Sequence, residues 1–276
     1  MNDVDKPKSY RPKLPDLEFV RYRVDSGIAY IMLDRPEKLN AISDQVVAEI
    51  RHAFQYFDLD PDARVAIVHG AGRAFTSGAD VRQRQLRPRE ELEAFGLWSP
   101  ETRRRDLFFD FVNWKPIISA AHGYVMGMGV GLCFSCDLVI AAASTKFQIT
   151  EVGRGLHSST LWALLRFRGA GSFADEVGLT GRIFTGEEAE RHRILTRATA
   201  DGEHLKVAED FARQLLKNPP LAVRATVRTR RMYLLEHQRM SFILTEHSPA
   251  LHLTRDFHEA AKAFVEKRSA PEFEGR

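Results

Sequence analysis

The stretch ISAAHGYVMGMGVGLCFSCDLVIAAA, residues 118–143, places four glycines within nine positions between two apolar segments. The apolar segment before the glycines is predicted to be a buried strand, and the segment after them a helix that runs toward Cys136. Glycine loses more conformational entropy on ordering than any other residue, so such a cluster indicates unusual backbone dihedrals or a ligand close to the main chain. In α/β sheets ligands bind where strands end and helices begin. The stretch therefore predicts a binding site made by the backbone.

The glycines follow neither of the common nucleotide-binding patterns. The pattern G-x-G-x-G lacks the spacing of the dinucleotide fingerprint, and no acidic residue ends a following strand in the usual place. No G-K-[ST] sequence follows, which excludes a phosphate loop. What remains is a main-chain N–H held open toward a ligand.

The rest of the chain predicts an α/β core followed by helices. Residues 17–24 and 28–33 predict a hairpin, a helix begins at Ser43, and 63–71 is an apolar run typical of a strand buried on both faces. Strand, helix and strand in this order imply a parallel sheet with right-handed crossovers. We expect a flexible arm at 1–15, a core at 16–200 and a helical region at 201–276. Amphipathic helices in that last region are predicted at 203–216, 221–236, 239–245 and 251–267.

Composition excludes several classes of protein. The 276 residues are 44% hydrophobic and 28% charged, which is ordinary for a soluble globular protein. A formal charge of +3 is too balanced to indicate a nucleic-acid partner. No apolar run is long enough for a membrane span, and the first fifteen residues have no apolar core of the kind a signal peptide carries, so we expect a cytoplasmic protein. The basic runs 102–105 and 228–231 are predicted to be solvated helix faces.

The two cysteines, Cys133 and Cys136, are spaced as C-x-x-C. Their neighbours are apolar, and neither a second cysteine pair nor nearby histidines complete a metal site. We therefore interpret both as small buried hydrophobic residues.

Four blocks carry a family resemblance: RPEKLNAIS at 35–43, GRAFTSGADV at 72–81, the glycine region at 120–156 and LTGRIFTGEEAERHRILTRA at 179–198. In order and approximate spacing they resemble the crotonase, or enoyl-CoA hydratase/isomerase, superfamily, over about residues 17–268. The resemblance implies an α/β crotonase spiral of ββα units that carries the active site, with a C-terminal helical region for trimerisation. It also implies acyl-CoA substrates, a homotrimer or a hexamer made of two trimers, and no cofactor beyond the coenzyme A of the substrate.

The resemblance also implies an oxyanion hole. In the family two backbone N–H groups bind the thioester oxygen as it becomes an enolate, and the matching positions are Ala79 and Met128. Preorganised donors of this kind each lower a barrier by roughly 3 to 4 kcal/mol. The residues expected around these two donors and the substrate are Ser77, Gly78, Asp80, Gly127, Gly129 and Gly131. The alternative interpretation is that the glycines only permit close packing of a strand and a helix, and that Asp80 caps a helix.

The catalytic carboxylates depart from the usual hydratase pair. Alignment on Cys136 places the first family glutamate at Gly131 and the second at Glu151. A single carboxylate resembles the double-bond isomerases of the family and its hydroxycinnamoyl-CoA hydratase-lyases. One base can remove an α-proton and return it elsewhere, and apolar neighbours should raise the pKa of Glu151 toward neutrality.

Further candidates leave the reaction open. His157 lies six residues after Glu151 and is a candidate second acid or base, which would permit hydration or carbon–carbon bond hydrolysis. The resemblance places Lys38 near the adenine nucleotide, and Phe264 and Lys267 on a helix over a neighbouring subunit's coenzyme A. The last alternative is a catalytically silent trimeric binding protein, which the missing first glutamate would allow.

Overall fold

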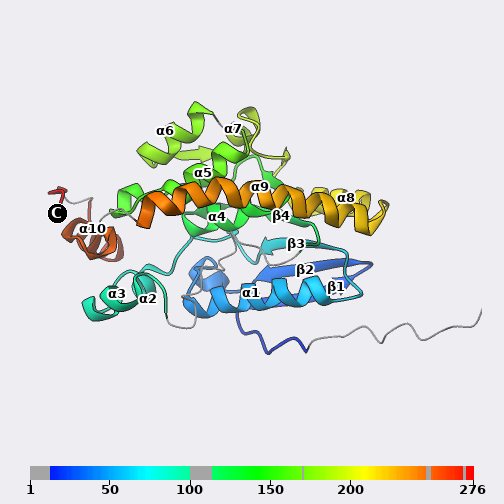
Figure 1. Ribbon diagram of the computed structural model, residues 1–276, viewed down its shortest axis with the longest axis horizontal. Helices are drawn as coiled ribbons and strands as arrows, with labels where there is room; N and C mark the ends of the chain where they lie inside the picture. Colours follow the sequence, from blue (N-terminus) through cyan, green and yellow to red (C-terminus); the bar gives the residue numbers. More distant parts are fainter. Residues whose placement is uncertain (1–12, 100–113, 170, 247–249, 270–271) are drawn as a thin grey trace, which may run out of the picture.

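A computed structural model describes residues 13–99, 114–169, 171–246, 250–269 and 272–276 (Figure 1). Most of the predicted arm at 1–15 and the basic run at 102–105 lie outside these residues. No helix in the described ranges is long and apolar enough to cross a membrane.

The larger sheet has six strands in the order β1-β2-β3-β4-β6-β9. Strands β1 and β2 form the predicted antiparallel hairpin, and the remaining neighbours are parallel. Ser26 and Gly27 both have positive φ, as the two central residues of a type I′ hairpin turn require. The strands are β1 Val20–Asp25, β2 Ile28–Leu33, β3 Val65–Gly70, β4 Ile117–Ala121, β6 Leu138–Ala142 and β9 Arg197–Thr199.

A smaller sheet has three strands, in the order β5-β7-β8. It comprises β5 Tyr124–Met126, β7 Lys146–Gln148 and β8 Ile183–Thr185. Strand β5 follows β4 after only two residues, so the chain passes from one sheet directly into the other.

Helices cover both faces of the larger sheet. Helix α1, Asp44–Leu59, begins at Ser43, whose hydroxyl accepts a hydrogen bond from the Val46 N–H. Its buried residues join a core that includes Ala66 and Val68 of β3, whereas α8, His204–Leu216, packs on Val65 and Ile67. Alternate residues of β3 thus contact different helices, which explains the continuous apolar run in its sequence. Figure 1 shows these helices on opposite sides of the strands.

The other helices are shorter and surround the junction of the two sheets. They are α2 Val81–Arg84, α3 Arg89–Phe95, α4 Met128–Ser135, α5 Ser159–Phe167, α6 Ser172–Thr180, α7 Gly186–Arg191 and α10 Arg255–Val265, with 3₁₀ turns η1 Pro36–Lys38, η2 Val152–Arg154 and η3 Leu251–Leu253.

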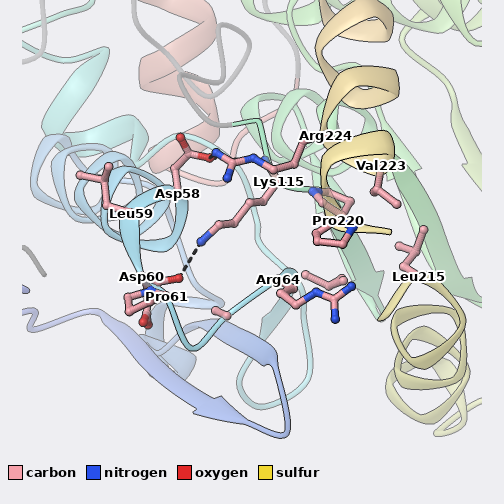
Figure 2. Close-up of a pocket in the computed structure, with 13 residues that line it drawn as sticks. Asp58, Leu59, Asp60, Pro61, Arg64, Lys115, Leu215, Pro220, Val223 and Arg224 are labelled. Atoms are coloured by element: carbon pink, nitrogen blue, oxygen red, sulfur yellow. Dashed lines mark hydrogen bonds and ion pairs between the residues drawn. The ribbon is translucent and has the colours of Figure 1, made fainter. Parts of the chain in front are cut away.

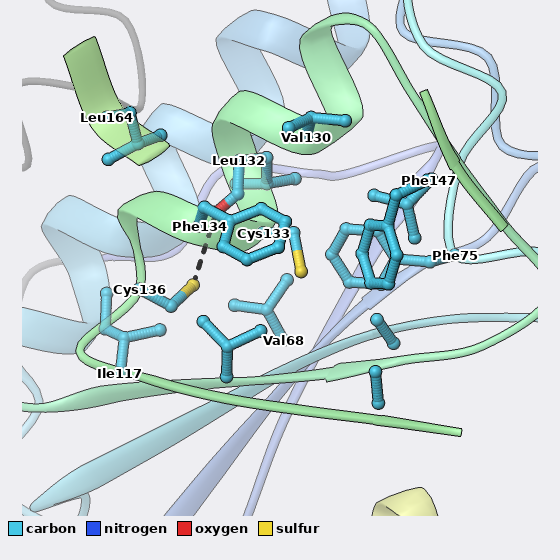
Figure 3. Packing of buried hydrophobic residues seen from close by; sticks show 14 of the residues in the cluster. Val68, Phe75, Ile117, Val130, Leu132, Cys133, Phe134, Cys136, Phe147 and Leu164 are labelled. Atoms are coloured by element: carbon cyan, nitrogen blue, oxygen red, sulfur yellow. Dashed lines mark hydrogen bonds between the residues drawn. The ribbon is translucent and has the colours of Figure 1, made fainter. Parts of the chain in front are cut away.

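Both cysteines are fully buried and free, as expected (Figure 3). Burial raises the pKa of the Cys133 thiol to about 12 and raises that of Cys136 as well. A thiol of such high pKa is a poor nucleophile. The pair therefore belongs to the core between α4 and the sheet.

The C-terminal region is helical, with two differences from the sequence prediction. Helix α9, Pro220–Glu246, is one continuous element where two were expected, because neither glycine nor proline occurs at 237–238 to interrupt it. The run 228–231 is not uniformly solvated. Arg231 is 3% exposed and pairs with Asp137 at 2.7 Å, and Arg230 pairs with the same carboxylate at 3.0 Å.

Candidate active site

A cavity of about 520 Å³ lies where the two sheets meet. It is bounded by the loop after β3, helix α2, the β5–α4 junction, the η2 turn and α10. Its lining residues are Leu39, Ser77, Ala79, Val81, Arg84, Gln85, Leu97, Trp98, Tyr124, Met126, Met128, Gln148, Thr150, Glu151, Arg154, Leu156, His157, Ser158, Thr160, Leu161 and Phe264.

A smaller cavity of about 240 Å³ lies at the start of α9 (Figure 2). The Lys115 ammonium there donates to the carbonyls of Phe57, at 2.7 Å, and Asp60, at 2.6 Å. None of the site residues predicted from the sequence lines this cavity, so we place the candidate site in the larger one.

The loop that carries Ala79 pairs with strand β5. The Thr76 N–H donates to the Tyr124 carbonyl at 3.0 Å, and the Met126 N–H donates to the Thr76 carbonyl at 3.2 Å. Gly78 has φ +85°, and a Cβ at this position would lie 2.4 Å from the Met126 carbonyl oxygen. Only glycine permits this close approach, which brings Ala79 beside the start of α4.

Asn40 holds the same loop from the other side. It is buried, and its side-chain amide donates to the carbonyls of Ala71 and Ala74 at 2.9 and 2.8 Å. The Thr76 hydroxyl donates to the Asn40 carbonyl at 2.6 Å and accepts from the Gly78 N–H at 3.0 Å. The RPEKLNAIS block thus positions the loop that carries Ala79 through Asn40.

Two N–H groups face this junction without backbone partners in the described chain. The Gly78 carbonyl and the Asp80 N–H both bond to Ile42, so the intervening Ala79 N–H is left unused. Gly127, with φ +48°, turns the chain into α4 and makes Met128 the first helical residue. The Met128 N–H therefore lacks an intrahelical acceptor and lies at the positive end of the helix dipole.

Glu151 lies beside this turn. A Cβ on Gly127 would lie 3.2 Å from Glu151 Oε1 and 2.6 Å from the Thr150 hydroxyl, so glycine leaves room for the carboxylate. The residue is partly exposed as a whole, but its Oε2 is enclosed and has no hydrogen-bond partner. Glu151 precedes η2 without capping it. It therefore does not act as a surface helix cap.

Burial raises the pKa of Glu151 from 4.5 to about 7, and this desolvation outweighs the opposing effects of the Glu151 and Thr150 N–H groups and of Arg154. A carboxyl with this pKa exists in both protonation states near neutral pH, as general acid/base catalysis requires. Among the described residues that line the cavity, Glu151 carries the only carboxylate.

Arg154 and His157 line the same part of the cavity. The Arg154 guanidinium lies 3.5 Å from the centroid of the Phe264 ring, and its Nη1 is buried without a partner. Partial burial lowers the pKa of His157, although the residue keeps exposed surface. A lowered pKa leaves the imidazole neutral near pH 7, so it can accept a proton.

The structure brings together six of the residues predicted from the sequence: Ser77, Ala79, Met128, Glu151, His157 and Phe264 all line the cavity. Phe264 was assigned by resemblance to a neighbouring subunit's site, but here it lines the cavity of its own chain. Gly78 and Gly127 shape the backbone without lining it. Gly129 permits close packing, since a Cβ there would lie 2.4 Å from Thr76 Cγ2.

Besides Gly78, Gly127 and Gly129, four more predicted residues do not line the cavity: Lys38, Asp80, Gly131 and Lys267. Asp80 caps α2 by accepting from the Gln83 N–H at 3.4 Å and pairs with Arg35 at 3.0 Å, so the helix-cap alternative describes its contacts better. Gly131 is buried within α4, and Lys38 and Lys267 are exposed elsewhere.

Several polar residues that line the cavity were not predicted as site residues, among them Arg84, Gln85 and Arg154. They lie in polar stretches whose residue types usually remain at the surface. No spacing in the sequence distinguishes them from their exposed neighbours.

Residues 23–276 match the model of the enoyl-CoA hydratase/isomerase family. The chain therefore belongs to this family, within the crotonase superfamily, and is an enzyme of the hydratase/isomerase type. It is 33% identical to the mevalonyl-coenzyme A hydratase of Aspergillus fumigatus over 251 aligned residues. The aligned region covers 87% of this chain and 89% of that protein. It is 27% identical over 270 aligned residues to the 1,2-epoxyphenylacetyl-CoA isomerase of Escherichia coli, and this region covers 94% of this chain and 100% of that protein.

The fold has solved counterparts. EchA1_1 from Mycobacterium paratuberculosis matches with a TM-score of 0.81 at 24% identity, covering 95% of this chain and 100% of that one. The crotonase-type fold predicted from the sequence is thus confirmed. The two relatives above are named for different reactions, so membership of the family gives acyl-CoA chemistry and leaves the particular reaction to the site.

Proposed function

We propose that this enzyme stabilises the enolate of an unsaturated acyl-CoA with the Ala79 and Met128 N–H groups, while Glu151 transfers the proton at the α-carbon. The observation that carries the proposal is that Glu151, the one carboxylate among the described lining residues, shares the cavity with two backbone N–H groups that have no backbone partner in the described chain. When the Glu151 carboxylate removes the α-proton, negative charge moves onto the thioester oxygen, where fixed donors stabilise it most.

Double-bond isomerisation is the reaction that these groups can complete without another catalyst. Glu151 takes the α-proton of a β,γ-unsaturated thioester, and the dienolate forms in the oxyanion hole. The same carboxyl returns the proton at the γ-carbon, so the double bond moves into conjugation and no atom is gained or lost. Gly131, at the position of the first family glutamate, carries no side chain that could activate water.

Hydration is the second candidate, and the position of His157 favours it. A neutral imidazole in the same cavity could accept a proton from water that attacks the β-carbon, while Glu151 protonates the α-carbon. The hydratase-lyase and carbon–carbon hydrolase alternatives would also need this second group. Replacing His157 with Gln separates the two candidates, because isomerisation should persist and hydration should be lost.

The test of Glu151 compares binding with turnover. The Glu151→Gln variant should bind saturated and unsaturated acyl-CoA thioesters by calorimetry but should lose at least 10³-fold in turnover, followed by mass spectrometry of the product. Glu187→Gln is the matched control, because that carboxylate is 72% exposed in a surface ion pair. Turnover by Glu151→Gln at the rate of the control would remove Glu151 from the mechanism.

We also propose that the enzyme assembles as a homotrimer or hexamer through its helical region. Helix α9 exposes Leu221, Met232 and Tyr233 by 77%, 60% and 66%. Contiguous exposed apolar patches are typical of interaction surfaces, and Met232 and Tyr233 are neighbours in the chain. Analytical ultracentrifugation should give three or six times the chain mass of 31.4 kDa, and a monomer would contradict the proposal.

A further inference from the structure

Arg84 is a buried cation in the same cavity. The residue is 2% exposed, and its Nη1 lies 3.4 Å from the sulfur of Met128, the residue whose N–H is the proposed oxyanion donor. Its Nη2 donates to the Leu97 carbonyl at 3.2 Å, and its guanidinium carbon lies 4.2 Å from the centroid of the Trp98 ring. Arg84 therefore lies next to the residue expected to hold the thioester carbonyl.

Among the described residues, the charge of Arg84 is incompletely balanced. Asp44 pairs with both Arg84 and Arg87, so one carboxylate serves two guanidinium groups. The Arg84 Nε lies 3.5 Å from Asp44 Oδ1, and that oxygen makes no hydrogen bond. The next carboxylate, Asp80, is itself paired with Arg35. Desolvation lowers the pKa of Arg84 to about 10, in keeping with weak compensation of its charge.

Arg84 also keeps donors for a ligand. A guanidinium has five N–H groups, and each terminal nitrogen carries two. In the described chain Nη1 has only the weakly accepting Met128 sulfur, and Nη2 has one carbonyl. A planar carboxylate can take two parallel hydrogen bonds from such a group.

Gln85 supplies a second, independent observation. It lines the cavity, it is 8% exposed, and its Oε1 is buried without a hydrogen-bond partner. A buried amide group that remains unsatisfied costs about 1–3 kcal/mol, so a polar ligand group at this point would offset that cost. Since the amide can rotate, it can offer either its oxygen or its NH₂ to the ligand.

We infer that Arg84 and Gln85 bind a carboxylate carried by the acyl chain, so that the preferred substrates are mono-CoA thioesters of dicarboxylic acids. The inference rests on the proposed function, because it takes Met128 as the thioester end of the cavity. A free carboxylate at the far end of a short acyl chain would reach Arg84 along the wall formed by Leu97 and Trp98. It would give the guanidinium a second charge partner besides Asp44, which among the described residues it shares with Arg87.

The phosphates of coenzyme A are the other anions that could meet Arg84. They are less suited to this place, because Arg84 is enclosed beside Met128 whereas the long nucleotide tail must leave the cavity. The two sources of negative charge can be separated experimentally, since the phosphates are common to all thioesters and the carboxylate is not.

The experiment measures the dissociation constants of glutaryl-CoA and adipyl-CoA against those of their ω-methyl esters by isothermal titration calorimetry. Each saturated acid and its ester differ in the terminal charge and by one methyl group. The wild type should bind each acid about tenfold or more tightly than its ester, as expected for hydrogen bonds to a charged group. Arg84→Met should reduce this ratio to about one, while the exposed Arg82→Met control on the same helix should leave it unchanged.

Two further variants guard against a folding defect. Arg84→Lys retains the charge without the planar fork and should keep an intermediate ratio, and Gln85→Leu should lower the ratio by a few fold. Binding of the ester by each variant, together with an unchanged circular dichroism spectrum, shows that the cavity is intact.

The results that would contradict the carboxylate inference can be distinguished from the result that would contradict the proposed function. Equal binding of acid and ester by the wild type would overturn the inference while leaving the proposed function in place. Equal weakening of acid, ester and free coenzyme A in Arg84→Met would place a coenzyme A phosphate on Arg84 and also overturn it. If none of these thioesters bound to the wild type, the proposed function itself would fail.

Discussion

At the scale of single residues, Glu151 shows how catalysis and stability oppose one another. An unfolded chain releases the Glu151 proton near pH 4.5, whereas the folded enzyme retains it to about pH 7. The folded state therefore binds more protons in this interval, and its stability falls as the pH rises from 4.5 to 7. The Glu151 carboxylate destabilises the native state where it is most useful as a base.

The first prediction is that the ionised Glu151 carboxylate lowers the stability of the folded enzyme. Glu151→Gln removes the ionisable group, so it should raise the free energy of unfolding at pH 8 by about 2 kcal/mol and leave it nearly unchanged at pH 4.5. The full shift would correspond to about 3 kcal/mol, and the partial exposure of the residue reduces it. Urea unfolding at the two pH values provides the measurement. A variant less stable than the wild type at pH 8 would show that the carboxylate is not penalised by burial.

The second prediction concerns Gly127. An alanine here would have to adopt φ +48° and would place its Cβ 2.6 Å from the Thr150 hydroxyl. Turnover should fall about 100-fold, because Met128 and Glu151 would both be displaced, with a loss of stability of about 1–3 kcal/mol. Gly153→Ala is the control, since a Cβ at Gly153 meets no atom within 4 Å. Similar turnover by both variants would argue against the role of the Gly127 turn.

At the scale of residues, the sequence allowed a site residue to be assigned where its proposed role uses a backbone N–H group. The family resemblance assigned Ala79, Met128 and Glu151 from the sequence, and the structure brings all three to one cavity. Arg84 was not predictable. Its burial results from packing of Asp44, Leu97 and Trp98 around it, and no local pattern distinguishes it from the exposed Arg82 two positions earlier.

At the scale of elements, Asp137 ties the long helix α9 to the sheet. Its carboxylate accepts from the Ile117 N–H at 2.8 Å and pairs with Arg230 and Arg231 of α9. Its side chain is 8% exposed. One acidic residue at the start of β6 thus anchors both strand β4 and the helix.

The third prediction follows from this anchor. Asp137→Asn would remove the carboxylate charge that pairs with the buried cation Arg231 and with Arg230, and the enzyme should lose about 3 kcal/mol of stability. Thermal unfolding followed by circular dichroism gives the measurement, with the exposed Glu187→Gln variant as control. If Asp137→Asn melted together with that control, the ion pairs would contribute nothing to anchoring α9.

Elements were predicted well where their periodicity is strong. The hairpin, helix α1 and the apolar strand β3 all form where expected, because each buries an apolar face or run. The continuity of α9 was missed. Apolar periodicity weakens around residues 237–238, but the chain carries no glycine or proline there, so nothing stops helical hydrogen bonding.

At the scale of the whole molecule, the site exists only because distant segments converge. Residues 77–85, 124–128 and 148–161 come from successive crossovers of the two sheets, and Phe264 of the last helix completes the wall. The direction of parallel strands makes such convergence expected at one edge. The size and polarity of the resulting cavity depend on side-chain packing and could not be read from the sequence.

The most direct test of the central claim is exchange of the α-proton of acyl-CoA thioesters for deuterium, followed by NMR across pH 5 to 9. The account predicts that exchange in the wild type increases with pH and levels off with a midpoint near 7, the pKa of Glu151, and that Glu151→Gln shows no exchange while still binding thioesters. Exchange that is independent of pH, or that persists in Glu151→Gln, would contradict the assignment of Glu151 as the group that moves the α-proton.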